Sequence, residues 1–556
     1  MDGHPHIPAM RPPEVVMRLA RMGSFHPTRL SFMRILLRRL ANERWRFDRP
    51  VWDVDARGVG RAIYRARGPE RTYSLVAFAH DLPDHLRSDR VIAEAWDATF
   101  ALFDGEPTEA DLDRLEANVP LQEAGRVTGS ELTLSRANRS VRLFAHVVDA
   151  LAAGRQPDAD ELQKVGYLMR TTAVYGSAKF GLSDREAICD RPELQAPFQA
   201  EMLTVWLIRA FTVDIAEHMA RVQNPDAPPL APELRRMLGV GNSTGLGMAP
   251  FLMTHPVLIN NWMAAREEAL ARVRHEPVRE ETCTHFLRAL DHAVENARLW
   301  QSEHPIQLAK LDDLRADLET LAAYVAQSPP DGAEGWDTLW HWAETTLSLE
   351  GQEQLLALML EPHGDLIDDL AEAMSADEDQ AFPIHGGQPL SDLKQDIEQV
   401  YSWALQTEWA AEAEKARLWY VSAEKLEPRL AERADEPLEP YEQALAPGRD
   451  VAALHASIAD WQGGSRVVDF LSAHPEHRYA VRRVQIAAAH GYAEIRDNTI
   501  GSEMKPIDML RAKLSFFGAT RFDPRSDRWV RISMFQNAPF PADFVPARAD
   551  EWMYGA

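Results

Sequence analysis

The sequence has 556 residues, of which 45% are hydrophobic and 26% are charged, and its formal net charge at pH 7 is −25. This length allows several domains, and an aromatic content of 15 Trp and 20 Phe excludes a wholly disordered chain. The only cysteines, Cys189 and Cys283, exclude a framework of several disulfides and a zinc site built on Cys pairs, and they favour a reducing compartment.

Nothing in the sequence predicts a secreted or membrane-spanning protein. Residues 1–13 lack the apolar core of a signal peptide, and no uncharged apolar stretch approaches the roughly 18 residues of a transmembrane helix. Basic residues are mostly Arg, which is typical of GC-rich bacterial genomes. We therefore expect a bacterial-type, cytoplasmic protein without integral membrane association.

Much of the negative charge lies between residues 310 and 440, where 30 acidic residues accompany 8 basic ones. Such a block repels phosphate backbones, so we expect no nucleic-acid partner. The simplest interpretation is a solvated helical face, and the alternative is a surface that binds a partner protein.

The N-terminal region, residues 1–110, is expected to hold a basic amphipathic helix and a β-hairpin. Leu30, Met33, Leu37 and Leu40 recur at helical spacing beside several arginines. Such a helix docks its apolar stripe on a core or lies on a membrane surface, and docking is the favoured interpretation.

The hairpin is predicted where residues 62–64 and 73–78 flank a turn signal at Gly68. It is the first part of the small β element that the sequence predicts. A helix over residues 89–103 is expected next, and another helix then begins with a capping box at Thr108-x-x-Asp111.

Residues 111–433 are expected to form the main, helical domain. The pattern is helical from Ser135 onward, and a helix over residues 197–222 is apolar on more than one face, which indicates a central core helix. Further helices are predicted over residues 257–274, 279–300, 308–326, 336–347, 353–360 and 390–431.

The C-terminal region, residues 448–556, is expected to combine α and β structure. Short helices are predicted over 451–461 and 467–473, and strands over 478–498 and 529–535, where β-branched and aromatic residues alternate with polar ones. The fold class is therefore expected to be mainly α, with a large multi-helix core and a small β element made from the N-terminal hairpin and the C-terminal strands.

The most unusual segment is residues 239–251, Gly-Val-Gly-Asn-Ser-Thr-Gly-Leu-Gly-Met-Ala-Pro-Phe. We expect a loop between two helices, in which glycines let consecutive N–H groups converge on an anion. His255 then precedes a helix whose N-terminus also favours negative charge. No P-loop or Rossmann pattern is present, and a tight packing corner is the alternative. The candidate substrate-binding residues of this region are Gly241, Asn242, Thr244, Gly245, Gly247 and Asn260.

Ser243-Thr244 and Met248-Ala249-Pro250 resemble the flexible loop of the fumarase/aspartase superfamily of helical lyases. That loop carries two serines and a downstream Met-Pro-x-Lys, and a serine acts as the base. The resemblance is confined to this segment, and no Lys follows Pro250. It implies lyase-type chemistry with Ser243 as the base.

A second group of polar residues is predicted on one face of a strand over residues 490–498. Alternation places His490, Tyr492, Glu494 and Arg496 on the same side, where they could supply acid–base groups and a clamp for a carboxylate. A solvent-facing strand with paired charges is the alternative.

The leading hypothesis is a metabolic enzyme that acts on a small anionic substrate, a carboxylate or a phosphate. Its candidate catalytic residues are Ser243, His255 and His490, and Arg496 is a further candidate substrate-binding residue. The competing hypothesis is a helical interaction or regulatory protein without catalysis. No metal ligands are assigned, the cofactor is unknown, and a homo-oligomer is left open.

Overall fold

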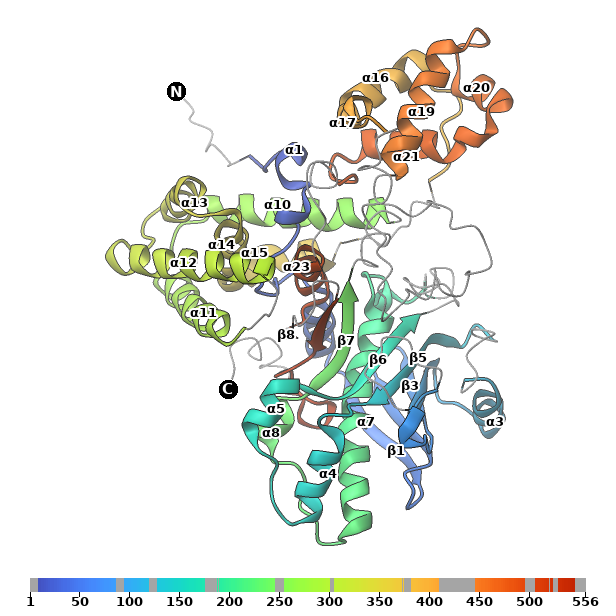
Figure 1. Ribbon diagram of the computed structural model, residues 1–556, viewed down its shortest axis with the longest axis vertical. Coiled ribbons are helices and arrows are strands. Elements are labelled where there is room, and N and C mark those ends of the chain that lie inside the picture. The colour runs from blue at the N-terminus through green and yellow to red at the C-terminus, as the bar shows by residue number, and fades with distance from the viewer. Residues whose placement is uncertain are drawn as a thin grey trace.

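The computed structural model describes the chain in segments. They are residues 9–86, 95–119, 128–175, 188, 190–245, 255–300, 305–372, 374, 382–409, 446–495, 506–519, 521–523 and 529–545. Figure 1 shows two main parts, a mixed β-sheet and a layer of helices, and a smaller group of helices at one end of the molecule.

The sheet has nine strands in the order β1-β2-β3-β4-β5-β6-β7-β9-β8. All neighbouring strands are antiparallel except β6 and β7. The strands are β1 (Arg46–Val54), β2 (Gly60–Arg67), β3 (Thr72–Ala79), β4 (Ala98–Asp104), β5 (Glu131–Arg139), β6 (Tyr167–Tyr175), β7 (Gly239–Gly245), β8 (Arg521–Asp523) and β9 (Trp529–Met534). Short helices between the early strands are α3 (Glu109–Asn118), α4 (Phe144–Ala152) and α5 (Ala159–Val165).

The parallel pair β6 and β7 is joined by α7 (Gln199–Gln223) and the short α8 (Pro232–Arg236). Parallel neighbours require such a crossover, because a tight turn can only reverse the chain. α7 is buried along most of its length and packs against β3 through β7. The predicted central core helix is therefore confirmed.

A helical layer shares one continuous hydrophobic core with the sheet. Its members are α1 (Pro13–Val16), α2 (Phe32–Asn42), α10 (Pro256–His275), α11 (Glu280–Leu299), α12 (Pro305–Gln327), α13 (Gly335–Thr346), α14 (Leu349–Leu360), α15 (Gly364–Glu372) and α23 (Pro506–Phe517). The helices predicted over residues 257–360 are confirmed. Docking of the basic helix is also confirmed, because Met33 and Leu37 of α2 are fully buried.

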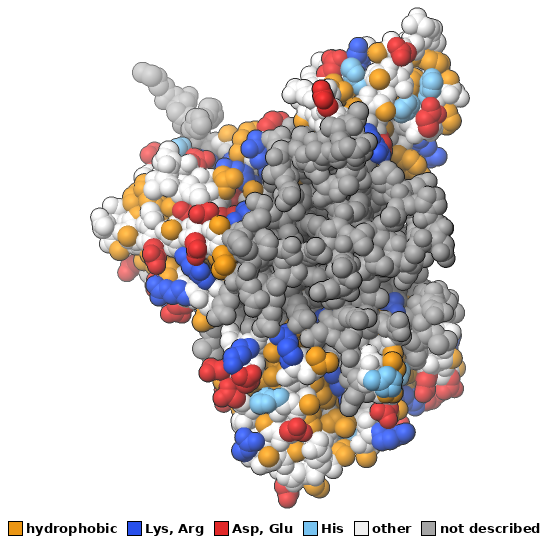
Figure 2. All heavy atoms as spheres, viewed as in Figure 1, with side chains coloured by type: hydrophobic (Ala, Val, Ile, Leu, Met, Phe, Trp, Pro, Cys, Tyr) orange, Lys and Arg blue, Asp and Glu red, His pale blue; other side chains and the backbone are white. Residues whose placement is uncertain are grey.

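The acidic block is not a solvated face throughout. Glu350, Glu353 and Glu361, on or next to α14, are buried. Arg11 bonds to Glu353 at 2.7 Å, and Arg34 bonds to Glu361 at 2.7 Å. Basic residues of the N-terminal region and acidic residues of the block thus neutralise one another inside the protein. In the view of Figure 2, acidic and basic side chains are interspersed over the part of the surface that is described.

The smaller helical group has its own hydrophobic core. It consists of α16 (Leu390–Val400), α17 (Ser402–Gln406), α19 (Ala446–Asp460), α20 (Val467–Ala473) and α21 (Arg478–Ala489). Of the helix predicted over 390–431, only its first part can be compared, because residues 410–445 lie outside the described segments. The two short helices predicted over 451–473 are confirmed.

The prediction that β structure is only a small element is wrong, because the sheet is one of the two main parts of the fold. β4 lies where a helix over residues 89–103 was expected, and β5 and β6 lie in the region expected to be helical from Ser135. β4 is buried on both faces and mostly apolar, so periodicity cannot separate it from a helix. In β5, Leu132 and Leu134 do alternate with Glu131, Thr133 and Ser135, and this strand signal was missed.

Of the two strand regions predicted near the C-terminus, one is confirmed and one is wrong. β9 confirms the strand over 529–535, whereas α21 occupies residues for which a strand over 478–498 was expected. Ala480, Val481, Val484 and Ala487 of α21 are buried at helical spacing against the small core. The hairpin is confirmed as β2 and β3, and the capping box at Thr108 is confirmed.

The sheet takes strands from all three regions expected from the sequence, residues 1–110, 111–433 and 448–556. The proposed division into domains stays a prediction. Among the helices that the structure describes, none is both long and apolar enough to span a membrane.

Candidate functional site

The Gly-rich segment begins as a strand, and the loop predicted over residues 239–251 is wrong for its first half. β7 lies between β6 and β9 and pairs with β9 from Val240 to Gly245. A Cβ on Gly239 would lie 2.4 Å from the carbonyl oxygen of Met534, and one on Gly241 would lie 2.7 Å from the ring of Tyr167. These two glycines therefore allow close packing within the sheet.

The strand changes how this segment can bind an anion. Successive N–H groups of a strand point to opposite neighbours, so those of Gly239–Gly245 cannot converge on one ligand. The backbone of Gly239–Gly245 therefore does not form the predicted anion site, whereas the roles predicted for side chains of this segment stay predictions. Any ligand beside β7 must be recognised by side chains or by residues after Gly245.

A chain of hydrogen bonds connects β6, β7 and α23 beside this strand. Lys513 Nζ donates to Asn242 Oδ1 at 3.0 Å, and Asn242 Nδ2 donates to Thr171 Oγ1 at 3.2 Å. The Thr171 hydroxyl in turn donates to the carbonyl oxygen of Gly241 at 3.3 Å. The candidate residue Asn242 thus orients a lysine that is distant in sequence.

Aromatic packing positions Lys513 over β7. Phe516 of α23 contacts Trp262 of α10, with ring centroids 4.0 Å apart. Phe517 contacts Phe198, with centroids 5.1 Å apart, and its ring lies 5.8 Å from Lys513 Nζ. Because these aromatic residues follow Lys513 by three and four positions, the face of α23 that packs inward also carries the amine.

Lys513 is a half-buried cation whose pKa is lowered. Desolvation penalises the ammonium and lowers the pKa of Lys513 to about 8. The side chain keeps some exposure to solvent, and its hydrogen bond to Asn242 is to a neutral acceptor. At neutral pH the group is mostly an ammonium that can bind an anion, and a substantial share becomes neutral amine near pH 8.

His255 lies at the N-terminus of α10, after residues 246–254, which are outside the described segments. Burial lowers the pKa of His255 to about 4, so its imidazole is neutral at physiological pH. A neutral imidazole can accept a proton, but a group of such low pKa is a weak base. The structure therefore favours a hydrogen-bonding role for His255, and its predicted role as a catalytic base or acid stays a prediction.

Asn260 and His490, two candidates far apart in sequence, are brought together. Asn260 Nδ2 bonds to His490 Nδ1 at 3.4 Å, and the backbone N–H of Tyr492 donates to Asn260 Oδ1 at 3.0 Å. The strand face predicted from His490 onward is wrong, because His490 caps the end of α21 and a turn follows. Glu494 is buried and pairs with Arg483 at 2.7 Å. These contacts join the small helical group to α10.

The other candidates are described only in part. The backbones of Ser243, Thr244 and Gly245 lie in β7, opposite Arg531, Val530 and Trp529 of β9. Gly247 and Arg496 fall outside the described segments, so their predicted roles stay predictions.

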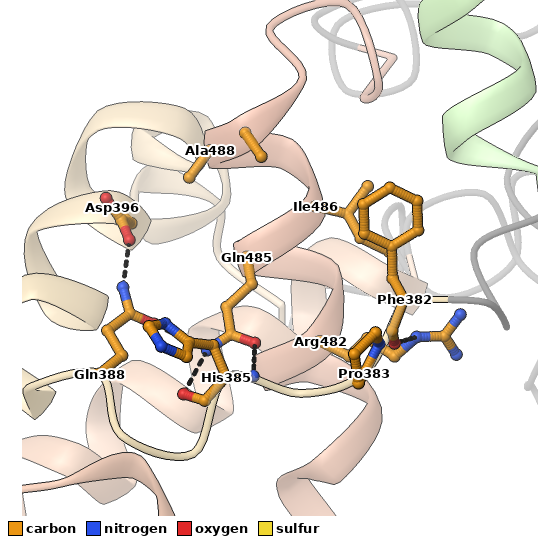
Figure 3. Close-up of a pocket in the computed structure, with 10 residues that line it drawn as sticks. Phe382, Pro383, His385, Gln388, Asp396, Arg482, Gln485, Ile486 and Ala488 are labelled. Carbon is orange, nitrogen blue, oxygen red and sulfur yellow. Dashed lines mark hydrogen bonds between the residues drawn. The ribbon is translucent and has the colours of Figure 1, made fainter.

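A separate pocket of about 330 Å³ lies in the small helical group, between residues 382–388 and α21 (Figure 3). Gln388 Nε2 donates to Asp396 at 2.7 Å, and Gln485 bonds to both the backbone N–H and the carbonyl of His385. The polar groups of the wall thus bond to one another. The wall carries both a carboxylate, Asp396, and a guanidinium group, Arg482, and none of the candidate residues lines this pocket.

Lys513 was missed by the sequence analysis. The available signal was its rarity, since lysine is uncommon in this chain, together with its position in an apolar segment that ends in Phe516 and Phe517. Its neighbour on β7 could not be foreseen, because 271 positions separate Lys513 from Asn242.

Comparison with known proteins adds no family to this description: no family model, curated protein or solved structure matches the chain.

Proposed function

We propose that the protein is a cytoplasmic enzyme that binds a small carboxylate or phosphate compound beside β7, with the ammonium group of Lys513 as the main anion-binding group. The observation that carries this proposal is the hydrogen-bonded chain from Lys513 through Asn242 to Thr171. An ammonium group attracts a carboxylate or a phosphate through its charge and through its N–H donors.

Asn242 is the sequence candidate that this arrangement supports most directly. Lyase-type chemistry with Ser243 as a base remains part of the proposal, and its support is the resemblance of Ser243-Thr244 and Met248-Ala249-Pro250 to the lyase loop. The competing hypothesis of a protein-interaction surface loses support from the ion pairs of α14, since part of the acidic block is already paired inside the protein.

The proposal is tested by measuring Tm of the purified full chain with inorganic phosphate, malate and succinate. An anion at about 100 times its Kd stabilises the folded state by about 2.7 kcal/mol, which corresponds to a rise in Tm of about 1 °C or more. We expect at least one of these anions to raise Tm, and we expect the rise to disappear in Lys513→Met.

The matched control is Lys164→Met. Lys164 is an exposed lysine of α5 that pairs with Glu161, and α5 lies at the Gly239 end of β7, whereas Lys513 bonds to Asn242. Its replacement removes the same charge and should leave the anion-dependent rise in Tm intact. A rise that persists in Lys513→Met, or that is absent from the unmodified protein with all three anions, contradicts the proposal.

A further inference from the structure

The pocket of the small helical group has the size and the lining of a small-molecule site (Figure 3). Ligand sites usually measure about 300–1,000 Å³ and combine a mainly apolar wall with a few polar groups. This pocket measures about 330 Å³, and because a cavity of about 150 Å³ holds benzene, it has room for one ring and a short chain. Its apolar wall consists of Phe382, Pro383, Ile486, Ala488 and Ala489.

Contacts outside the pocket hold the apolar wall in place. The ring of Phe382 packs edge-on against His490, with centroids 5.3 Å apart, and His490 bonds to Asn260 of α10. Ile486 is buried with Val257 of α10 in a small apolar cluster, against which Phe382 also packs. The wall is therefore formed before a ligand arrives, which lowers the entropic cost of binding.

The carboxylate of Asp396, on α16, is held in the wall by a chain of side-chain amides. Asp396 Oδ2 accepts from Gln388 Nε2 at 2.7 Å, and Gln388 Oε1 accepts from Gln485 Nε2 at 2.7 Å. Gln485 in turn bonds to the backbone N–H and the carbonyl of His385. The position of the carboxylate is therefore fixed relative to α21.

The negative charge of Asp396 is not neutralised by a neighbouring cation. Within the described part of the chain its carboxylate forms no ion pair, and its hydrogen bond is to the neutral amide of Gln388. Arg482, the guanidinium group of the wall, lies on the opposite side of the view in Figure 3, where its Nε donates to the Phe382 carbonyl at 3.1 Å. An ammonium group that reaches Asp396 forms a charge-assisted hydrogen bond, which is about twice as strong as a neutral one.

We propose that this pocket binds a small organic cation, a primary amine attached to an aromatic or branched apolar body. The ammonium group donates to Asp396, and the apolar body packs against Phe382 and Ile486. This site is separate from the anion site proposed beside β7, so neither proposal depends on the other.

The experiment titrates the full chain at pH 7 with 2-phenylethylamine and, separately, with 2-phenylethanol, and measures both affinities by isothermal titration calorimetry. The two probes share the ring and the chain and differ in the charged group. We expect the amine to bind about tenfold more tightly than the alcohol, because only the amine forms a hydrogen bond between two charged groups.

Two variants of α16 test the role of the carboxylate. Asp396→Asn removes the charge at nearly constant shape, so the affinity for the amine should fall to that for the alcohol. The matched control is Glu398→Gln, at an exposed carboxylate that pairs with His455 at 3.2 Å. Glu398 lies two positions after Asp396 and so points to another side of the helix, and its replacement should leave the affinity for the amine unchanged.

A third variant tests the place of binding. Ala488 lines the pocket but is exposed, so Ala488→Trp fills the space without disturbing the core and should abolish binding of both probes. An unchanged Tm of this variant shows that the fold is kept. Failure of the amine to bind the unmodified protein, equal affinities of the two probes, or undiminished binding of the amine to Asp396→Asn or Ala488→Trp overturns the inference.

Discussion

His363 shows what burial does to a single titratable side chain in this protein. It lies directly after α14, is 2% exposed, and packs edge-on against Trp336 with centroids 5.2 Å apart. Burial lowers the pKa of His363 to about 4, against the opposing effect of its hydrogen bond to the Met359 carbonyl. The imidazole is therefore neutral in the folded protein across the physiological range.

This pKa predicts acid sensitivity with a defined sign. An unfolded His has a pKa of about 6.5, so the unfolded chain binds more protons than the folded one between pH 6.5 and 4. The contribution of neutral His363 to the free energy of unfolding is fully present above about pH 6.5 and is lost as the pH falls through 4. Between pH 7 and pH 5 the loss from His363 is about 2 kcal/mol.

We therefore expect His363→Gln to lose less stability on acidification than the unmodified protein, measured by thermal unfolding at pH 7 and pH 5. The control is His341→Gln on α13, at a side chain that is 60% exposed, which shows how far a His→Gln replacement at the surface alters the pH dependence. An identical pH dependence in His363→Gln and the unmodified protein contradicts this account.

At the scale of elements, β7 depends on glycine for its place between β6 and β9. Gly241 packs against the face of Tyr167, which is buried and has little room to move. A strand interior usually disfavours glycine, so its presence here is explained by the close approach of neighbouring groups. Sequence periodicity does not reveal the need for glycine at this position, because the side chains that crowd it belong to residues distant along the chain.

We predict that Gly241→Ala destabilises the protein by about 1–3 kcal/mol, because the added methyl group would lie 2.7 Å from the Tyr167 ring. The measurement is urea unfolding of both proteins. Gly387→Ala is the control, since a Cβ at that position meets no atom within 4 Å. If Gly241→Ala loses no more unfolding free energy than Gly387→Ala, the strand can shift enough to accommodate the added methyl group, and the prediction is wrong.

The elements that sequence reasoning predicted correctly have an apolar face, a long apolar run such as α7, or a local turn or capping signal. The helices α10 to α14 show apolar stripes, and the hairpin of β2 and β3 has a turn at Gly68. β4 was missed because both of its faces are buried, and β5 was missed although Leu132 and Leu134 alternate with polar residues. α21 was mistaken for a strand although its apolar residues fit a helical spacing. Within the site, Asn242 was found because its segment has an unusual composition. Lys513 was not found, because its contact with Asn242 joins residues that are distant in sequence.

At the scale of the whole molecule, Glu353 joins segments from the beginning and the middle of the chain. It accepts hydrogen bonds from Arg11 at 2.7 Å, from Arg21 at 2.9 Å, and from Arg266. Burial alone would raise the pKa of Glu353, but the charges of Arg11 and Arg266 outweigh it and lower the pKa to about 2. The carboxylate is therefore the centre of a buried ionic cluster that holds the N-terminal region on α14.

Removal of the negative charge of Glu353 should destabilise the folded protein. Glu353→Gln leaves several buried guanidinium groups with less compensation, and we expect a loss of about 3–5 kcal/mol in the free energy of unfolding. The control is Asp312→Asn, at an exposed carboxylate that pairs with Arg315 at 3.2 Å, where we expect a change of at most about 1 kcal/mol. Comparable unfolding free energies for the two variants would contradict the role assigned to the cluster.

The sequence by itself determined the helices with one apolar face, the hairpin, the capping box and the docking of the basic helix, because each depends on spacing along a few turns or on a local turn. Only the tertiary structure decided that the acidic block supplies buried partners for N-terminal arginines, that the Gly-rich segment enters a sheet as β7, and that Lys513 lies beside Asn242. Those outcomes depend on desolvation and on contacts between residues hundreds of positions apart, and local periodicity contains no information about them.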